Sequence, residues 1–450
     1  MMNLFTIASQ GAQAAQNQLS VAAGNIANQQ TAGYSRQQVS QSATVVSQTG
    51  SGVKTSDAAR VTDQHINQAL WQSQTAAGYY QSMNSWGTSL EQVISTDSTQ
   101  PGTLLTTFFN SLSALTSQPD STAYRQQLLS SAAGVASGLS QTAETLAGQQ
   151  TSLTDQQSAA TQQITQISAE IAALNKQIQR AGSGAESNTL QDQRDQQVKS
   201  LSSLMSVSVE KTAEGSYRLT AANGATLVDG DQAATATSVQ NDQGVRQLRL
   251  TIGQQTSTVT ENVGGQLGAL YDYQQQVLSP LQTRVSGLMQ SVSDQVNSTL
   301  AKGYDLNGQS GGALFSVETS DSGVMSLKTT ALQASELGLS AGKDSPANGD
   351  NLQALLALQT ATGQAQSSSL ADQASGITSS LALANSQSSS QLTAATAVND
   401  QWQQQRDNLS GVNKDEEAVN LQTYLQSYQA NMKVMTVGNQ LFADLLNAFS

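Results

Sequence analysis

The sequence predicts a mainly α-helical protein with a smaller β insertion. Three observations indicate this fold class: both terminal segments have helical periodicity, a heptad repeat runs through the interior, and one region alternates like β-strands. We therefore expect terminal helices that form a coiled coil, a domain built as a bundle of long helices, and a small outer β domain. No stretch approaches about 18 consecutive apolar residues, so we expect no membrane insertion.

The N-terminal segment has the period of a helix with a narrow apolar face. The positions of this face alternate in steps of three and four and are Phe5, Ala8, Ala12, Ala15, Leu19, Ala22 and Ile26. Because most of them are small, the seam buries little apolar area and an isolated helix is marginal. We expect it to become ordered by packing against another element and to end near Asn28.

The C-terminal segment repeats this period with larger side chains. Its predicted seam consists of Ala418, Leu421, Leu425, Tyr428, Met432, Met435, Asn439, Phe442, Leu446 and Phe449. Asn439 is its strongly polar member, and a buried Asn in such a seam fixes helix register at a cost in stability. Asn413 is expected to cap the helix, with the acids Asp415 to Glu417 at its positive end. Adjacent acids on one helix do not face a common substrate, so we expect no paired-carboxylate site there.

The interior contains three further helical regions. A long helix is predicted over residues 135–178, entered at Pro119 to Ser121, because Leu139, Leu146, Leu153, Ala160, Ile167 and Leu174 recur every seven residues. We expect this stripe to be a seam inside the bundle rather than an exposed partner-binding face. Similar spacing predicts a helix over residues 370–409 and a helical region over 263–302 with a break at Pro280.

Between residues 206 and 262 the periodicity changes to that of half-buried strands. Alternating segments end at good turn signals, of which Asn223-Gly224 and Asp229-Gly230 are the clearest. Residues 303–345, rich in Gly and Ser, are expected to be irregular and partly stranded. The predicted domains are a terminal core domain (1–50 plus 405–450), a helical bundle domain (51–205 plus 263–404) and the β domain (206–262).

Composition excludes several classes of chemistry. The 450 residues include 19 basic and 32 acidic side chains, one histidine and no cysteine, for a net charge of −13. Without cysteine there is no thiol nucleophile, thiolate metal site or disulfide, and one histidine excludes multi-histidine metal centres. An acidic chain with few arginines is a poor nucleic-acid binder. We therefore expect no enzyme, no cofactor, no metal and no nucleic-acid partner, and we expect His65 to be a surface residue.

Three further motifs or absences are informative. The loop that begins Asp305-Leu306-Asn307-Gly308 lacks the Gly and Glu that a calcium loop needs at its sixth and twelfth places, so we expect a tight turn. Residues 338–344 lack the spacing and hydroxyl residue of a phosphate loop. Residues 1–35 carry no charged side chain and therefore lack the basic leader of a cleavable signal peptide. We expect a cytoplasmic protein or one exported by another route.

Both ends carry motifs that resemble a known family. At the N-terminus these are Asn25-Ile26-Ala27-Asn28, Thr31 and Gly33-Tyr34-Ser35-Arg36-Gln37; at the C-terminus they are Ser410 to Asn413, Glu416-Glu417, Asn420-Leu421 and Tyr428 to Asn431. Together they resemble the signatures of the bacterial flagellar axial proteins, which include rod, hook and hook-associated proteins. The interior segment 305–308, with Gly311 and Phe315, resembles the members that lie at the junction between hook and filament.

The resemblance implies a structural subunit that is needed for filament assembly and motility. It implies an extracellular location in the flagellum, reached by type III export of the unfolded chain. The implied partners are the hook protein, the second hook-associated junction protein, further copies of the chain in a ring, and an export chaperone on the C-terminal helix. The alternative is a sibling axial protein, either the hook protein or the second junction protein.

The residues expected at the assembly interface come from both ends. They are Phe5, Leu19, Asn25, Ile26, Asn28, Tyr34, Leu421, Leu425, Tyr428, Met432, Met435, Phe442 and Leu446.

Overall fold

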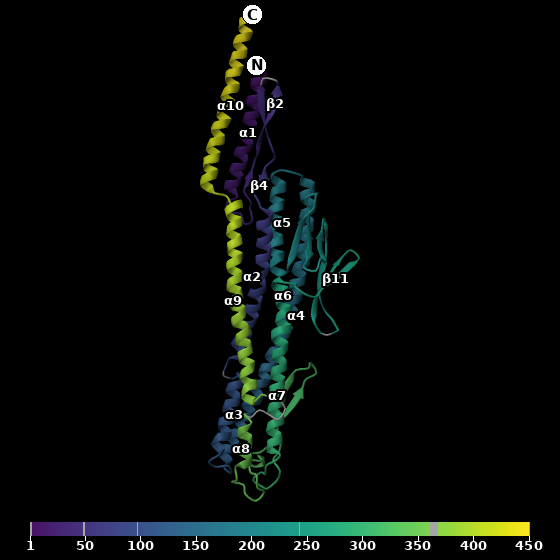
Figure 1. Ribbon diagram of the computed structural model, residues 1–450, viewed down its shortest axis with the longest axis vertical. Coiled ribbons are helices and arrows are strands. Elements are labelled where there is room, and N and C mark those ends of the chain that lie inside the picture. The colour runs from purple at the N-terminus through teal and green to yellow at the C-terminus, as the bar shows by residue number, and fades with distance from the viewer. Residues whose placement is uncertain (1, 48–49, 97, 243, 361–367, 450) are drawn as a thin grey trace.

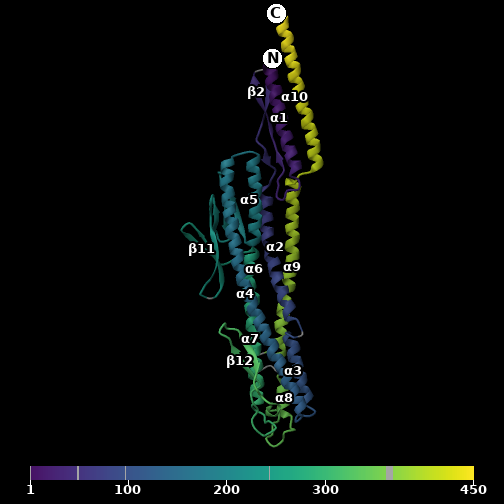
Figure 2. The ribbon, with the colours of Figure 1, turned by 180° about the vertical axis from the view of Figure 1, so that it is seen from behind.

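The computed structural model is an elongated rod with both chain ends at the same tip (Figure 1). It describes residues 2–47, 50–96, 98–242, 244–360 and 368–449. A terminal coiled coil forms that tip, a body of long helices carries a β domain on its flank, and an irregular region forms the far end (Figure 2). Most residues lie in helices and the sheets are small and antiparallel, so the predicted fold class is confirmed.

The terminal coiled coil consists of α1 (Met2–Ala27) and α10 (Lys414–Phe449). The two helices lie side by side in both views and run antiparallel, because Asn25 bonds to Glu417 near the body while Phe5 lies against Gly438 near the tip (Figure 1). The buried apolar residues of α1 are Ala8, Ala12, Ala14, Ala15 and Ala22. The marginal N-terminal helix thus finds a partner in the other end of the same chain.

Four strands follow α1. They are β1 (Gln37–Gln38), β2 (Gln41–Ser47), β3 (Gly50–Thr55) and β4 (Ala59–Arg60), with β1 paired to β4 and β2 paired to β3. β3 lies against α1. The domain boundary predicted between residues 50 and 51 therefore falls inside a strand, and the boundary predicted at 404/405 falls inside a helix, α9. Neither position carried a composition change that marks where an element ends.

The body is built from helices, the longest of which run along the rod axis (Figure 1). They are α2 (Gln64–Ile94), α3 (Pro101–Leu115), α4 (Thr122–Ala181), α5 (Ala185–Leu204), α6 (Gly265–Tyr273), α7 (Ser279–Leu300), α8 (Asp350–Ala357) and α9 (Leu370–Ser410). The helix predicted over 370–409 corresponds closely to α9. Helix α4 begins well before the predicted residue 135, because Leu128 and Ala132 extend its buried face. The first part of its predicted heptad stripe is an internal seam, with Leu139, Leu146 and Leu153 each 0% exposed. Ile167 and Leu174, farther along the stripe, are only half-buried.

The region 263–302 differs from the prediction at Pro280. Helix α6 continues through a π-helical segment (Gln274–Leu278) into α7 without a break in helical structure. Within this wider turn the Ser279 N–H bonds to the Gln274 carbonyl, five residues back. Pro280 then lies in the first turn of α7, where its missing N–H and fixed φ are tolerated.

The β domain lies where the alternating pattern predicted it. One sheet has the order β5–β6–β7–β8 and the other β11–β10–β9. The strands are β5 (Val207–Lys211), β6 (Tyr217–Ala221), β7 (Thr226–Asp229), β8 (Gln232–Ala233), β9 (Thr235–Gln240), β10 (Arg246–Ile252) and β11 (Gln255–Val259). Both predicted turns connect strands, and Gly224 and Gly230 have φ of +81° and +60°, which favour glycine.

The far end of the rod contains the region predicted to be irregular. It holds one two-stranded sheet, β12 (Phe315–Thr319) with β13 (Met325–Thr329), and a short 3₁₀ turn at Ala334–Glu336. The Asp305 carboxylate accepts bonds from the Asn307 and Gln309 N–H groups at 2.8 and 2.7 Å, which makes the predicted tight turn. Within the ranges that the structure describes, no helix is long and apolar enough to cross a bilayer.

Candidate functional site: the joint below the terminal coiled coil

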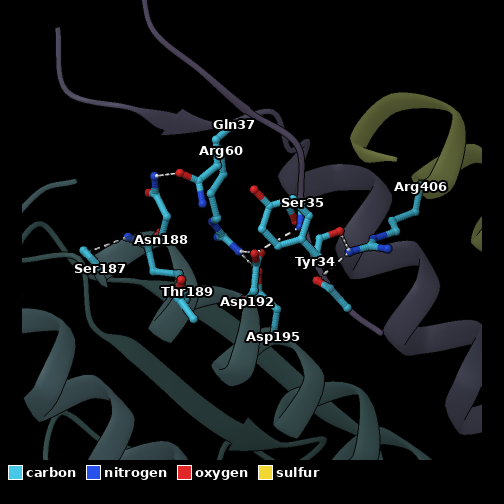
Figure 3. Close-up of polar contacts among 12 residues, drawn as sticks. Tyr34, Ser35, Gln37, Arg60, Ser187, Asn188, Thr189, Asp192, Asp195 and Arg406 are labelled. Atoms are coloured by element: carbon cyan, nitrogen blue, oxygen red, sulfur yellow. Dashed lines mark hydrogen bonds and ion pairs between the residues drawn. The ribbon is translucent and has the colours of Figure 1, made fainter. Parts of the chain in front are cut away.

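The segment from Gly33 to Gln37, here called the joint segment, lies where the terminal coiled coil meets the body (Figure 3). After α1 ends, the Asn28 side chain donates to the Gly24 carbonyl at 2.9 Å, and the chain turns at residues 28–34. Gly33 has φ of +81°, a left-handed conformation that side chains disfavour. This turn directs the joint segment across the middle of α5, the C-terminal end of α9 and the N-terminal end of α10.

Asn25 connects α1, the joint segment and α10. It is 1% exposed, and its amide makes four hydrogen bonds. Its nitrogen donates to the Gln37 carbonyl (2.9 Å) and to Glu417 Oε1 (3.2 Å). Its oxygen accepts from the Gln37 N–H and the Tyr34 hydroxyl, both at 2.9 Å. Each bonding position of the amide is therefore used within the chain.

The end of α9 is bonded to the joint segment from the other side. The Arg36 N–H donates to the Ser410 carbonyl at 2.7 Å. The Arg406 guanidinium donates to the carbonyls of Gly33 (2.8 Å) and Tyr34 (3.2 Å). Arg36 also approaches Glu416 at 3.5 Å, but the Glu416 side chain is 61% exposed, so this pair contributes little.

Asp192 and Asp195, one turn apart on α5, bind Arg60 and the joint segment (Figure 3). One Arg60 nitrogen lies 2.8 Å from both Asp192 and Asp195, and the Ser35 N–H donates to Asp192 at 3.0 Å. The Arg60 and Asp192 side chains are each only 8% exposed. Burial alone lowers the pKa of Arg60, but the carboxylates of Asp195 and Asp192 outweigh burial and raise it above its ordinary value.

The same α5 carboxylates reach the β domain. The Tyr217 hydroxyl donates to Asp195 at 2.9 Å, and Arg194 stacks over the Tyr217 ring with its guanidinium carbon 3.5 Å from the ring centre. Burial is the main cause that raises the pKa of Tyr217. Asp195 thus joins the terminal region, through Arg60, to strand β6.

Tyr34 is the other tyrosine whose ionisation is affected by the joint. Burial, followed by the charges of Asp192 and Glu417, raises the pKa of Tyr34 to about 12. The hydroxyl therefore remains protonated and donates to Asn25 at every physiological pH.

An open cavity of about 880 Å³ lies beside the joint segment. Its walls come from the joint segment and from α2, α5 and α9, and include Trp71, Lys199 and Arg406. Lys199 donates to Gln403 at 2.7 Å, and burial followed by the Arg406 charge lowers its pKa. His65 is exposed on α2 and meets Trp402 edge to face at 6.2 Å. No nucleophile is paired with a base in these contacts, so their chemistry is that of holding chain segments together.

The predicted interface residues fall into three groups. Asn25, Asn28 and Tyr34 belong to the joint and its turn, where they bond within the chain. The residues that line or flank the contact between α1 and α10, all partly buried, are Phe5, Leu19, Ile26, Leu421, Tyr428 and Met435. The exposed ones are Leu425 (42%), Met432 (40%) and Phe442 (50%). Leu446 lies in α10, and its side chain is outside the described part of the chain.

The face of α10 that meets α1 differs in part from the face that the sequence pattern predicted. The side turned to α1 includes Glu417, Tyr424, Asn431 and Gly438, none of which the sequence pattern selected. Asn439, predicted to be a buried polar residue, is exposed. Asn431 takes that place, because a Cβ on Gly11 would lie only 2.4 Å from its side-chain oxygen.

Further large apolar side chains are exposed on α10 and were missed by the single predicted seam. They are Val419, Val434, Val437, Leu441 and Leu445. The last four recur in steps of three and four and so form one stripe along the helix. A search for more than one apolar face on the same helix would have found this stripe.

Comparison with known proteins identifies the family. The model described as the flagellar hook-associated protein FlgK helical domain matches residues 88–315, slightly more than half of the chain. The chain belongs to the FlgK family. A second model, described as the flagellar basal body rod FlgEFG protein C-terminal, matches residues 403–448, which include the end of α9 and most of α10. The resemblance to the flagellar axial proteins is therefore confirmed.

Curated FlgK-family relatives cover the chain in part. The flagellar hook-associated protein 1 of Escherichia coli K12 is 28% identical over 332 residues, covering 70% of this chain and 60% of the relative. That of Salmonella typhimurium is 29% identical over 341 residues with the same coverage, and that of Bacillus subtilis is 27% identical over 230 residues, covering 48% of this chain and 45% of the relative. The chain thus spans about 60% of the length of the first two relatives.

A solved structure shares the fold. The flagellar hook junction protein FlgK from Burkholderia pseudomallei superposes with a TM-score of 0.65 at 17% identity, covering 77% of this chain and all of that one. FlgK-family proteins are structural flagellar components, so the expectation that the chain is not an enzyme is confirmed.

Proposed function

We propose that this chain is a structural subunit of the junction between hook and filament, and that it assembles into a ring through the terminal coiled coil. The observation that carries the proposal is the apolar stripe on α10, Val434, Val437, Leu441 and Leu445, whose side chains are 41–52% exposed in the single chain although α10 is paired with α1. Exposed stripes of this kind mark interaction surfaces in soluble proteins. Burial of the exposed half of each side chain contributes on the order of 1 kcal/mol.

The unequal lengths of the terminal helices support this proposal. Helix α10 has 36 residues and α1 has 26, so α10 extends about 15 Å farther at 1.5 Å per residue. Figure 1 places the C-terminus beyond the N-terminus at the tip. Phe442 and Leu445 lie on this extension, 50% and 44% exposed, where a neighbouring copy would cover them.

The implied partners and location belong to the same proposal. The partners are the hook protein on one side and the second hook-associated junction protein on the other, with an export chaperone that covers α10 before assembly. The location is extracellular, at the hook–filament junction, after type III export. The lack of cysteine suits such export, because no disulfide restrains an unfolded chain.

The proposal is tested with charged substitutions in the α10 stripe. Val437→Asp and Leu441→Asp place a charge on the apolar face, so cells should carry hooks without filaments and should release filament protein into the medium. Gln429→Asp, also exposed on α10, is the matched control and should leave filaments normal. Immunoblots of the medium check that each variant is exported. Normal filaments on cells that export Val437→Asp and Leu441→Asp would contradict the proposal.

A second experiment separates the sibling axial proteins. Deletion of residues 410–450 removes α10, and the same filament-free hooks are expected. Immunogold labelling of isolated hooks should then mark a thin zone at the distal end of the hook in wild-type cells. Labelling along the whole hook would instead identify the chain as the hook protein.

A further inference from the structure

The last turns of α9 are held to the rest of the protein by polar contacts. The buried apolar residues of α9 are Leu370, Ala374, Ile377, Leu381 and Ala395, all of which lie before its last fifteen residues. Beyond them, Asn399 accepts a bond from Ser73, Gln403 accepts one from Lys199, and Arg406 donates to the joint segment. Trp402 and Leu409, the large apolar residues of these turns, are only half-buried, so hydrogen bonds contribute much of what positions the end of α9.

The link between α9 and α10 is short and has contacts on both sides. Helix α9 ends at Ser410 and α10 begins at Lys414. The joint segment bonds to Ser410 through Arg36, and Asn25 bonds to Glu417 in the first turn of α10. The open cavity beside this link leaves space into which the coiled coil would tilt if the bonds were absent.

We propose that the joint segment and Arg406 form a lock that fixes the angle between the terminal coiled coil and the body. Arg406 is the positioning residue, because one guanidinium nitrogen binds two successive carbonyls, those of Gly33 and Tyr34, from a helix that lies across the joint. Its side chain is only 17% exposed, so solvent screens these bonds weakly. Loss of the lock frees the angle without unfolding the coiled coil or the body.

The lock adds a mechanism to the proposed function. Only its consequence for ring assembly rests on that function. Copies in a ring present the α10 stripe to each other at one angle, and a fixed joint supplies that angle before assembly. The angle itself is a property of the single chain and is measured on the monomer.

The angle between the coiled coil and the body can be followed as a distance between two spin labels. Labelling is specific because the chain contains no native cysteine. Labels at Gln177→Cys on α4 and Gln426→Cys on α10, both exposed sites, report the distance across the joint. A second pair, Gln16→Cys on α1 with Gln426→Cys, reports pairing inside the coiled coil. Pulsed electron paramagnetic resonance gives the distance distribution for each pair in the full-length monomer.

The wild-type protein should give narrow distributions for both pairs. Arg406→Gln should at least double the width across the joint and leave the width inside the coiled coil unchanged. Arg406→Lys, which keeps the charge on a shorter side chain, should give an intermediate width. Arg218→Gln, which removes an exposed pair with Asp229 in the β domain, is the control and should change neither width.

Three outcomes would overturn the lock: a wild-type distribution that is already broad across the joint, an unchanged width in Arg406→Gln, or broadening of both pairs together. These results are independent of the filament experiment. If Val437→Asp assembles normally while Arg406→Gln broadens the distribution across the joint, the proposed function fails and the lock stands.

Discussion

The body and the terminal coiled coil are both helical, but they bury different kinds of side chain. In the body, large residues such as Leu139, Leu146 and Val285 are 0% exposed and interlock in one continuous core. In the coiled coil, the buried apolar residues of α1 are alanines, while Leu441 and Phe442 on α10 remain about half exposed. The body thus has a large apolar core of its own, whereas the coiled coil leaves much of its apolar surface exposed in the single chain.

The joint between these regions differs from both, because it is polar and charged. Its contacts are directional hydrogen bonds, which hold a geometry but contribute less net stability than an apolar core of the same size. The coiled coil is therefore attached to the body mainly by hydrogen bonds, which fix its orientation more than they add to stability. The four predictions below test that comparison, in order of decreasing effect.

The largest effect is expected for Arg60→Gln. The change leaves the Asp192 and Asp195 carboxylates buried without their cation, which costs about 3–5 kcal/mol of unfolding free energy. Urea denaturation followed by tryptophan fluorescence measures the loss; Trp71, which lies edge to face with Tyr217, is one of the three tryptophans. The control Arg218→Gln should leave the urea midpoint unchanged. A midpoint for Arg60→Gln equal to that of the wild type would mean that the α5 carboxylates do not support the body.

The second prediction compares the buried core of the body with the exposed apolar surface of α10. Leu146→Ala opens a cavity in the core and should lower the unfolding free energy of the body by about 2–4 kcal/mol. Leu425→Ala, at a residue that is 42% exposed, should change it by less than about 0.5 kcal/mol. Calorimetry of the monomer measures both. Equal losses would show that α10 is already covered in the single chain.

Replacing a glycine of the coiled coil by alanine should have a smaller effect on stability. The sign of that effect depends on the space around the added Cβ. A Cβ added to Gly24 in α1 would meet open space, so Gly24→Ala should stabilise the helix by about 0.5–1 kcal/mol. A Cβ on Gly438 would approach the Phe5 ring to 3.0 Å, so Gly438→Ala should weaken helix pairing instead. Hydrogen exchange of the α1 amides should slow in the first variant and accelerate in the second. The same direction of change in both would refute close packing at Gly438.

The smallest effect concerns the ionisation of Tyr34. Because its pKa is raised to about 12, the folded joint favours the neutral hydroxyl. Its contribution to stability is complete below the ordinary tyrosine pKa of about 10 and is lost as the pH rises from there through 12. In an absorbance titration, Tyr34→Phe should remove amplitude near pH 12 and none near pH 10. Amplitude lost near pH 10 would place Tyr34 in water, outside the joint.

Much of the fold was predictable because its signals are local. The heptad spacing of Leu139, Leu146 and Leu153 is a property of neighbouring residues, and it indicated both α4 and its buried face. Alternation and glycine turns indicated the β domain in the same way. The phase of α10 was not predictable, since its apolar residues occupy more than one face and the spacing alone does not select the face that meets α1.

The joint was predictable only in part. The motif around Asn25 and Tyr34 was recognised, but those residues were assigned to contacts between subunits, whereas the structure uses them within the chain. Arg60, Asp192 and Arg406 gave no signal, because isolated polar residues on helices form no periodic pattern. Their partners lie far away in sequence: Arg60 is 132 residues from Asp192, and Arg406 is 373 residues from Gly33.

The sequence by itself determined the helical class, the β insertion and the lack of thiol and multi-histidine chemistry, because composition and local periodicity carry that information. The family was indicated separately, by the resemblance of the terminal motifs. Only the tertiary structure decided which face of α10 meets α1, and that Asn25 satisfies its four hydrogen bonds inside one chain. The same holds for the convergence of α5, α9 and α10 on the joint segment. Such contacts depend on the path of the whole chain, since a hydrogen bond requires two groups to meet within about 3 Å whatever their separation in sequence.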